Sequence, residues 1–171
     1  MPKGYEMAGK NIFPVPEVPL KIIKLLATEK IPFVIVGGAA IALHGIPRST
    51  IDIDIVVPAE AETVSKLFFT IQKVGILSRD RYIITMIDRP NLLIGQWITL
   101  QDRAGMEFID IFFESKKEFI GLLKRAKKIK SIRFNFHIAS LDDLEKMKKK
   151  SARAIDLADI VLIREKRGKK K

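Results

Sequence analysis

The stretch Arg48-Ser49-Thr50-Ile51-Asp52-Ile53-Asp54-Ile55-Val56-Val57 decides the fold. Its β-branched residues predict a strand over residues 51–57. Because side chains alternate along a strand, Asp52 and Asp54 share one face and the isoleucines occupy the other. Two carboxylates on an apolar strand cost free energy unless a positive group lies between them. The stretch therefore predicts a central strand that presents two acids to a polar site.

Carboxylates arranged in this way suit a hard divalent cation, Mg2+ above all, and nucleotide phosphates can complete its shell. Paired ions about 3.5–4 Å apart drive in-line phosphoryl displacement in polymerases. Taken alone, an Asp-x-Asp sequence more often marks exposed charges on a loop or an edge strand. The apolar flanks of this strand and the Gly37-Gly38 pair that precedes it favour a metal site.

Asp110 is the candidate third carboxylate. It stands alone among the apolar residues of 106–113, a second predicted strand, and pairing this strand beside 51–57 brings the three acids together. Glu107 competes for the role, but the two-residue period places it on the opposite face. The alternative for Asp110 is a buried acid paired with an arginine or a backbone donor.

Residues on either side of a short predicted helix, 39–44, are candidates for phosphate contacts. Gly37 and Gly38 allow backbone N–H groups to approach a phosphate, which the following helix N-terminus also favours. Arg48 is placed to pair either with a triphosphate or with Asp52, and the Ser49 and Thr50 hydroxyl groups are suited to hold the loop in shape.

Composition limits the classes of function. The chain has 171 residues, of which 47% are hydrophobic, as expected for one domain with a real core. The absence of cysteine excludes disulfides and thiolate metal sites, and two histidines are too few for a histidine-based zinc centre. The sequence shows neither a signal peptide nor a membrane span, so we expect a cytoplasmic protein with no membrane partner.

The charge balance favours an anionic partner. Lys and Arg number 31 against 20 Asp and Glu, a formal net charge of +11. Part of the excess lies in a basic tail, residues 164–171, which reads as a solvated chain end. Frequent Lys and Glu are also typical of thermophile proteins, so composition alone leaves contact with RNA open.

The order of predicted elements gives an α/β (α+β) fold in which helices pack on a mixed sheet and a C-terminal helical pair closes the chain. An extended N-terminal arm, 1–19, precedes the domain at 20–163, and the basic tail follows it. A turn at 102–105 joins two strands in a hairpin. The predicted strands are 32–36, 51–57, 82–87, 93–100, 106–113 and 132–139, and the predicted helices are 20–30, 39–44, 59–74, 115–128, 141–150 and 152–164.

Gly37-Gly38, Arg48-x-Thr50-x-Asp52-x-Asp54 and Asp110 together resemble the DNA polymerase β-type nucleotidyltransferase superfamily. The resemblance covers about residues 20–163 and is strongest to the minimal branch that includes the AbiEii-like toxins of toxin–antitoxin systems. Leu141-Asp142-Asp143-Leu144, Met147-Lys148 and Arg153-x-x-Asp156-Leu157-x-Asp159 are similar to the closing helices of that branch. Ala152 and Ile155 stand where the branch commonly has Gly and Lys.

The resemblance implies a nucleotidyltransferase-like fold and metal-dependent transfer of a nucleoside monophosphate from a nucleoside triphosphate to RNA, such as tRNA, or to a protein. Asp52 and Asp54 would bind two Mg2+ or Mn2+ ions, and Asp110 would bind the ion that activates the acceptor. Gly37 and Gly38 would hold the triphosphate. An antitoxin protein would be a further partner.

The same resemblance implies that Lys148 steadies phosphate charge and that Asp156 supports the site. Their neighbours give a plainer interpretation, in which Lys148 belongs to a solvated basic face and Asp156 is a salt-bridged surface group. A catalytically inactive relative that binds RNA or a protein partner is the main alternative function. The third candidate function is a metal-dependent phosphohydrolase, which the lack of a histidine-rich metal site disfavours.

Overall fold

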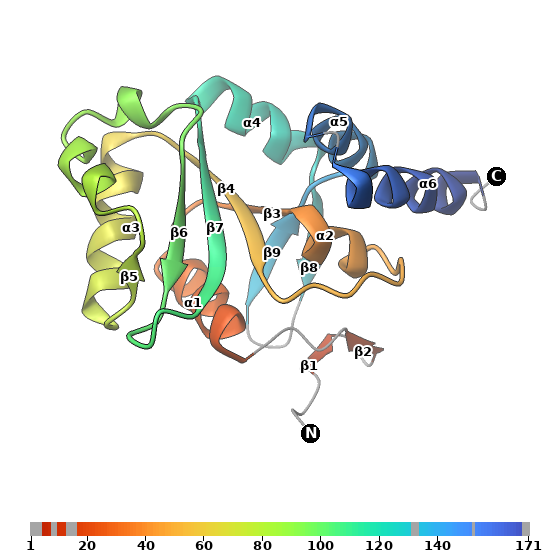
Figure 1. Cartoon of the computed structure of the whole chain (residues 1–171), viewed down its shortest axis with the longest axis horizontal. Coiled ribbons are helices and arrows are strands. Elements are labelled where there is room, and N and C mark those ends of the chain that lie inside the picture. The colour runs from red at the N-terminus through yellow and green to blue at the C-terminus, as the bar shows by residue number, and fades with distance from the viewer. Residues whose placement is uncertain (1–4, 8–9, 13–16, 131–133, 152, 169–171) are drawn as a thin grey trace.

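A computed structural model describes residues 5–7, 10–12, 17–130, 134–151 and 153–168 and gives the chain a mixed α/β architecture (Figure 1). The main sheet has seven strands in the order β5-β6-β7-β4-β3-β9-β8. These strands are β3 Val34–Val36, β4 Ile53–Pro58, β5 Leu77–Ser78, β6 Trp97–Gln101, β7 Glu107–Glu114, β8 Lys127–Lys130 and β9 Asn135–Ile138.

Helices pack on this sheet, as the sequence predicts. They are α1 Glu17–Thr28, α2 Gly37–Leu43, α3 Ala61–Lys73, α4 Lys116–Arg125, α5 Leu141–Ser151 and α6 Ala154–Gly168. Helices α2, α5 and α6 lie together beyond β4, whereas α3 lies toward the β5 end (Figure 1). Within the described residues, no helix is both long and apolar enough to cross a membrane.

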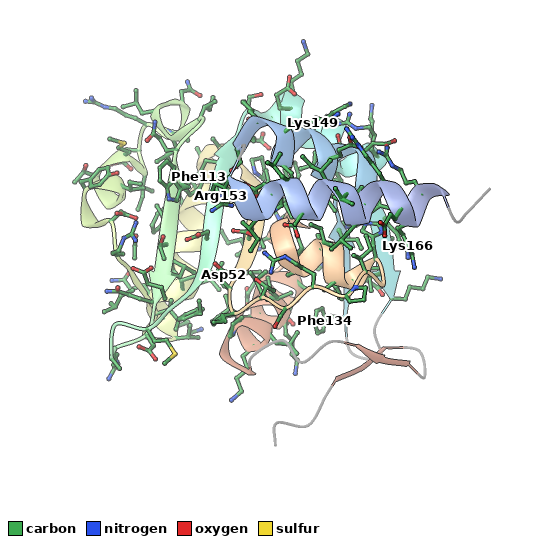
Figure 2. All side chains as sticks on the ribbon, turned by 45° about the vertical axis from the view of Figure 1, so that its right-hand side comes forward. Asp52, Phe113, Phe134, Lys149, Arg153 and Lys166 are labelled. Carbon is green, nitrogen blue, oxygen red and sulfur yellow. The ribbon has the colours of Figure 1, made fainter. Side chains whose placement is uncertain are left out.

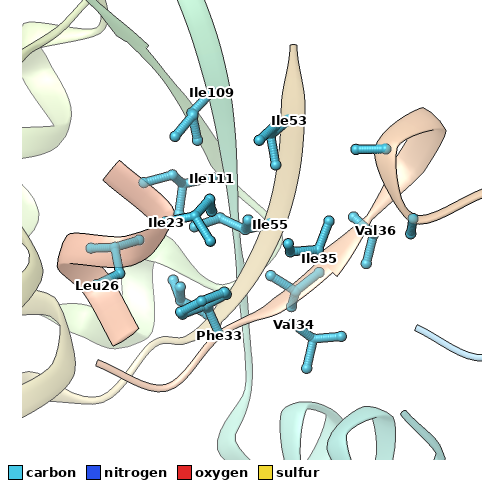
Figure 3. Packing of buried hydrophobic residues seen from close by; sticks show 14 of the residues in the cluster. Ile23, Leu26, Phe33, Val34, Ile35, Val36, Ile53, Ile55, Ile109 and Ile111 are labelled. Atoms are coloured by element: carbon cyan, nitrogen blue, oxygen red, sulfur yellow. The ribbon is translucent and has the colours of Figure 1, made fainter. Parts of the chain in front are cut away.

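The core lies on the face of β4 and β7 that carries the isoleucines. Ile53 and Ile55 of β4 and Ile109 of β7 are at most 2% exposed, and they pack toward Ile23 and Leu26 of α1 (Figure 3). Because side chains alternate along each strand, the acids of β4 and β7 must point away from this core. Burial of the isoleucines therefore decides which face carries the polar site.

Strand β4 starts two residues later than the sequence predicts. The expected strand was 51–57, but β4 is Ile53–Pro58, and Asp52 lies in the bend before it. Asp54 remains on the strand, and Ile51 is 78% exposed. An exposed Ile51 gains nothing from the core, which explains why the ladder begins only at Ile53.

The predicted strand 82–87 is wrong. The segment forms a 3-10 helix, η1 Arg81–Met86, and a second one, η2 Pro90–Leu93, shortens the expected strand 93–100 to β6. The place beside β6 is taken by β5, which pairs Leu77 with Gln101. The segment thus has no neighbouring strand to pair with, despite its β-branched composition.

The edge strand β8 falls partly inside a predicted helix. The sequence predicted one helix over 115–128, but α4 ends at Arg125 and Lys127–Lys130 pairs antiparallel with β9. This pairing buries Ile129 opposite Phe136. The predicted strand 132–139 is confirmed at β9, while residues 131–133 lie outside the described residues.

The two chain ends contain more regular structure than the sequence predicts. In the arm expected to be extended, β1 Tyr5–Met7 pairs antiparallel with β2 Lys10–Ile12, and α1 already begins at Glu17. Helix α6 continues to Gly168, beyond the expected start of the basic tail at residue 164.

Candidate active site

The acid row consists of Asp52, Asp54 and Asp110, and the neighbouring strands β4 and β7 at the centre of the sheet align it. The parallel pairing of β4 with β7 sets Asp54 beside Asp110, and the antiparallel pairing of β7 with β6 sets Thr99 on the other side of Asp110. Asp52 lies just before β4, and its charge acts on both Asp54 and Asp110. The structure therefore places the three expected carboxylates at neighbouring positions of the sheet.

Two threonine hydroxyl groups orient this row. The Thr50 Oγ1 hydroxyl donates to Asp52 Oδ1 at 2.8 Å, and the Thr99 Oγ1 hydroxyl donates to Asp110 Oδ1 at 2.7 Å. Sequence reasoning missed Thr99. The signal was its place in the predicted hairpin, because the pairing of the two strands puts a hydroxyl directly beside the lone strand acid.

Helix α2 starts two residues earlier than the predicted helix 39–44, so the tight backbone turn at Gly37 and Gly38 is the beginning of this helix, and it lies against the acid row. Gly37 has φ +64°, and a Cβ atom added there would lie 1.8 Å from Asp54 Oδ2. A Cβ atom added at Gly38 would lie 3.2 Å from Thr50 Oγ1. Only a residue without a side chain allows the turn to lie this close to Asp54.

Lys148 is buried, which corrects its interpretation as part of a solvated basic face. It is 7% exposed, and its Nζ forms ion pairs with Asp156 at 2.7 Å and Asp159 at 2.8 Å. Arg153 forms a third pair with Asp156 at 2.9 Å. Asp156 and Asp159 are at most 1% exposed, so they are not surface groups either.

Burial alone would raise the pKa of Asp156. Hydrogen bonds from Arg153 and Lys148 outweigh that effect and hold the pKa well below its usual range. Asp156 therefore remains a carboxylate inside the fold and keeps the Lys148 ammonium in place beside the acid row.

Arg48 pairs with Asp159, and not with Asp52. The guanidinium Nε donates to Asp159 Oδ1 at 2.8 Å, and another nitrogen donates to the Ser49 carbonyl oxygen. The loop that carries Ser49 and Thr50 is thereby tied to α6, more than a hundred residues away in sequence. Asp159 thus joins the site indirectly, by fixing this loop and Lys148.

Glu107 lies on the same side as Asp110, contrary to the sequence-based expectation. The ladder between β6 and β7 pairs Leu100 with Ile109 but Gln101 with Glu107, so β7 contains one extra residue at this point. Such a bulge shifts the alternation of side chains. Glu107 and Asp110 consequently line one pocket, and Glu107 pairs with Arg79 at 3.1 Å.

Two pockets flank the acid row. One, of about 420 Å³, includes Arg48, Thr50, Asp52, Glu107 and Asp110 in its lining. The other, of about 250 Å³, lies between the sheet and the C-terminal helices, and Gly37, Asp54, Lys148, Arg153 and Asp156 contribute to its lining. Figure 2 shows Arg153 where α6 begins, above Asp52 in that view.

Comparison with known proteins bears on the fold. No protein-family model matches the chain, and no curated protein sequence matches it. Among solved structures, an antigenic nucleotidyltransferase-like protein from Paracoccidioides brasiliensis matches at TM-score 0.52 and 15% identity, over 88% of this chain and 78% of that one. A candidate nucleotidyltransferase from Thermotoga maritima matches at TM-score 0.52 and 15% identity, over 86% of this chain and 92% of that one.

The fold is nucleotidyltransferase-like. This confirms the fold that the sequence resemblance implies. The two matches do not distinguish branches of this fold, so the AbiEii-like assignment stays a prediction. Within this fold, the acid row and the two pockets define the candidate active site.

Burial, together with nearby negative charge, raises the pKa of two members of the row. Burial, with the charges of Asp52 and Asp110, raises the pKa of Asp54 from 3.8 to about 6. Burial also raises the pKa of Asp110, against the hydrogen bond from Thr99, which lowers it. A cation between these groups would remove the repulsion, because it stabilises the ionised form of each carboxylate.

The donor set suits Mg2+ or Mn2+, since all three side chains offer carboxylate oxygens. Among the described residues, no three His, Asp or Glu side chains already converge closely enough to form a metal-binding cluster. Ion binding at Asp52, Asp54 and Asp110 would therefore require these side chains to turn toward one another.

Replacing Asp54 by asparagine is expected to stabilise the metal-free protein above pH 6. The raised pKa means that ionising Asp54 costs folding free energy, and this cost appears as pH rises from about 3.8 through about 6. Asp54→Asn should raise the free energy of unfolding in EDTA at pH 8 by up to about 3 kcal/mol, with little difference near pH 3.5. Urea unfolding at both pH values measures this effect. Equal stability of the variant and the wild type at pH 8 would contradict it, and Asp88→Asn, at an exposed carboxylate, is the control.

Gly37→Ala is expected to destabilise the protein more than Gly95→Ala does. Both glycines have positive φ, but nothing lies within 4 Å of a Cβ atom at Gly95, whereas Asp54 obstructs one at Gly37. The backbone cost at each site is about 1–2 kcal/mol, and the clash adds about 1–3 kcal/mol at Gly37 alone. Denaturant midpoints of the two variants measure the difference. Equal losses would show that the turn is free to move away from Asp54.

Proposed function

We propose that this protein is a metal-dependent nucleotidyltransferase, which transfers a nucleoside monophosphate from a nucleoside triphosphate to an acceptor. The observation that carries the proposal is the register that sets Asp54 beside Asp110, with Asp52 next to them, in a nucleotidyltransferase-like fold. Acids held at fixed strand positions are suited to fix cations where charge develops during phosphoryl transfer.

In this proposal Asp52, Asp54 and Asp110 hold two Mg2+ ions when nucleotide is bound. The ions would supply neutralisation of the charge on the transferred phosphoryl group and on the leaving pyrophosphate. The carboxylates themselves fix the positions of the ions, and the hydroxyl groups of Thr50 and Thr99 fix two of these carboxylates.

The smaller pocket is assigned to the triphosphate. It combines the close approach of Gly37 with the cationic groups of Lys148 and Arg153, whose charges act on Asp54. Lys148 is held by two buried acids and cannot leave the site easily, so it offers a fixed positive charge to a phosphate. Ser49 and Thr50 would contact the nucleotide from the loop that Arg48 anchors to Asp159.

The larger pocket is assigned to the acceptor. Asp52 and Asp110 line it, so a hydroxyl group there lies beside a carboxylate whose pKa is raised. The acceptor oxygen would attack the α-phosphorus, pyrophosphate would leave, and Asp110 would accept the hydroxyl proton. RNA such as tRNA, or a protein, would be the acceptor, and the role of toxin with a cognate antitoxin belongs to this proposal.

Nucleotide binding tests the proposal. Calorimetry with ATP, GTP, CTP and UTP should show binding of at least one nucleotide that requires Mg2+, because the phosphates complete the coordination of the ion. Asp52→Asn and Asp54→Asn should each abolish the metal-dependent part, whereas Asp88→Asn should leave it intact. Equal nucleotide binding by the wild type and the Asp52→Asn/Asp54→Asn variant would instead favour a non-catalytic module that binds RNA or a protein partner.

Labelled nucleotide then identifies the acceptor. Incubation with each α-labelled triphosphate, Mg2+ and bulk RNA should leave label on RNA 3′ ends or on protein. Release of free monophosphate alone would contradict transfer and favour hydrolysis. The Asp110→Asn variant should bind nucleotide but transfer it more slowly, because the proposed proton acceptor is missing.

A further inference from the structure

A basic surface lies at the β8 edge of the sheet, outside the candidate active site. We define it by five exposed lysines on α4, β8 and α5, namely Lys124, Lys127, Lys128, Lys130 and Lys146. We propose that this surface binds the phosphate backbone of a double-helical nucleic acid. The proposal stands independently of the catalytic function.

The five lysines lie on the edge strand β8 and on the two helices next to it. Helix α4 ends at Arg125, and β8 begins two residues later at Lys127. Arg125 pairs with Asp143 in the first turn of α5 at 2.9 Å, and the charge of Lys146 also acts on Asp143. The end of α4, the start of β8 and the first half of α5 therefore meet at this edge.

The positive charge here is uncompensated within the described part of the chain. None of the five lysines forms an ion pair with a described residue. The nearby acids are already engaged, since Asp143 pairs with Arg125, and Glu145 pairs with Lys149, Arg164 and Arg167. Lys116 and Arg79, by contrast, have acidic partners. Part of the net positive charge of the chain is therefore exposed at this edge without acidic partners.

Protection of an edge strand does not explain the whole surface. Lysines on an exposed edge strand discourage pairing with a strand of another chain. This role is enough to explain Lys127, Lys128 and Lys130 on the edge strand β8. Lys124 and Lys146 lie on helices, where no strand pairing threatens. Their addition to the same surface indicates a multivalent anionic ligand.

Near this surface the described aromatic side chains are the half-buried Phe134 and the buried Phe136, whose rings pack against each other at 5.7 Å instead of standing free for bases. Proteins that bind single strands combine basic grooves with aromatic side chains on which bases stack. Among the described residues, the exposed aromatic side chains Phe69, Tyr82 and Trp97 belong to α3, η1 and β6, near the other end of the sheet. Phe136, next to β8, is 7% exposed. The ligand that fits is therefore a duplex, read through its phosphates.

The test measures binding of a fluorescent RNA hairpin and of a DNA duplex by anisotropy over a range of salt concentrations. The wild type should bind both, with affinity that falls steeply with salt. The Lys127→Gln/Lys128→Gln/Lys130→Gln variant should bind at least tenfold more weakly at low salt, and the slope of log affinity against log salt should fall by about 2.7, or 0.9 for each lost phosphate contact.

The matched control is Lys24→Gln/Lys66→Gln/Lys73→Gln, which removes the same charge from exposed positions on α1 and α3. It should bind like the wild type, and circular dichroism should show both triple variants folded. Equal losses in the two variants, or no binding by the wild type, would overturn the proposal. Tighter binding to poly-glutamate than to either duplex would overturn it in favour of an acidic protein partner. Retention of duplex binding by Asp52→Asn/Asp54→Asn is expected, because catalysis and this surface are separate.

Discussion

The parallel pairing of β4 with β7 is the constraint on which the candidate site depends. It places Asp54 beside Asp110. Ionisation of Asp54 costs up to about 3 kcal/mol, first because Asp54 is buried and then because Asp52 and Asp110 carry like charge. The same register buries Ile53, Ile55, Ile109 and Ile111 on the other face. Burial of four such side chains stabilises the folded state by about 6–12 kcal/mol, which exceeds the cost of ionising Asp54. A slip of one residue would bury the acids and expose the isoleucines, which fixes the register.

The charges around the acid row do not cancel. Arg48, Lys148 and Arg153 carry three positive charges, but Asp156 and Asp159 take up two of them. The network therefore presents a net charge of about +1 to three carboxylates, and the site as a whole keeps about two negative charges. The buried Asp156 and Asp159 hold the cationic side chains in place but also cancel most of their charge, so these side chains do not neutralise the acid row. A divalent cation would balance the two negative charges that remain.

The sequence predicts those features of the site that depend on neighbouring residues, and it does not predict those that depend on residues far apart along the chain. The alternation around Asp52 and Asp54 and the hairpin that carries Asp110 are local patterns, and they predicted the sheet and its acid face. Burial of Lys148 is not local, because the lysine-rich stretch around it is typical of a solvated helix until Asp156 and Asp159 fold back onto it. The position of Glu107 depends on a single extra residue in β7, which no periodicity shows in advance.

Charge is partitioned over the sheet. The acid row occupies β4 and β7, whereas the basic surface occupies β8, three places away in the strand order. Lys148 and Arg153 lie between them, but their acids limit how far their charge acts beyond the smaller pocket. Salt screens exposed charges over about 8–10 Å, so a divalent ion bound at the row and a polyanion bound at the edge would interact only weakly. A nucleic acid held at β8 would thus gain affinity without displacing cations from the acid row.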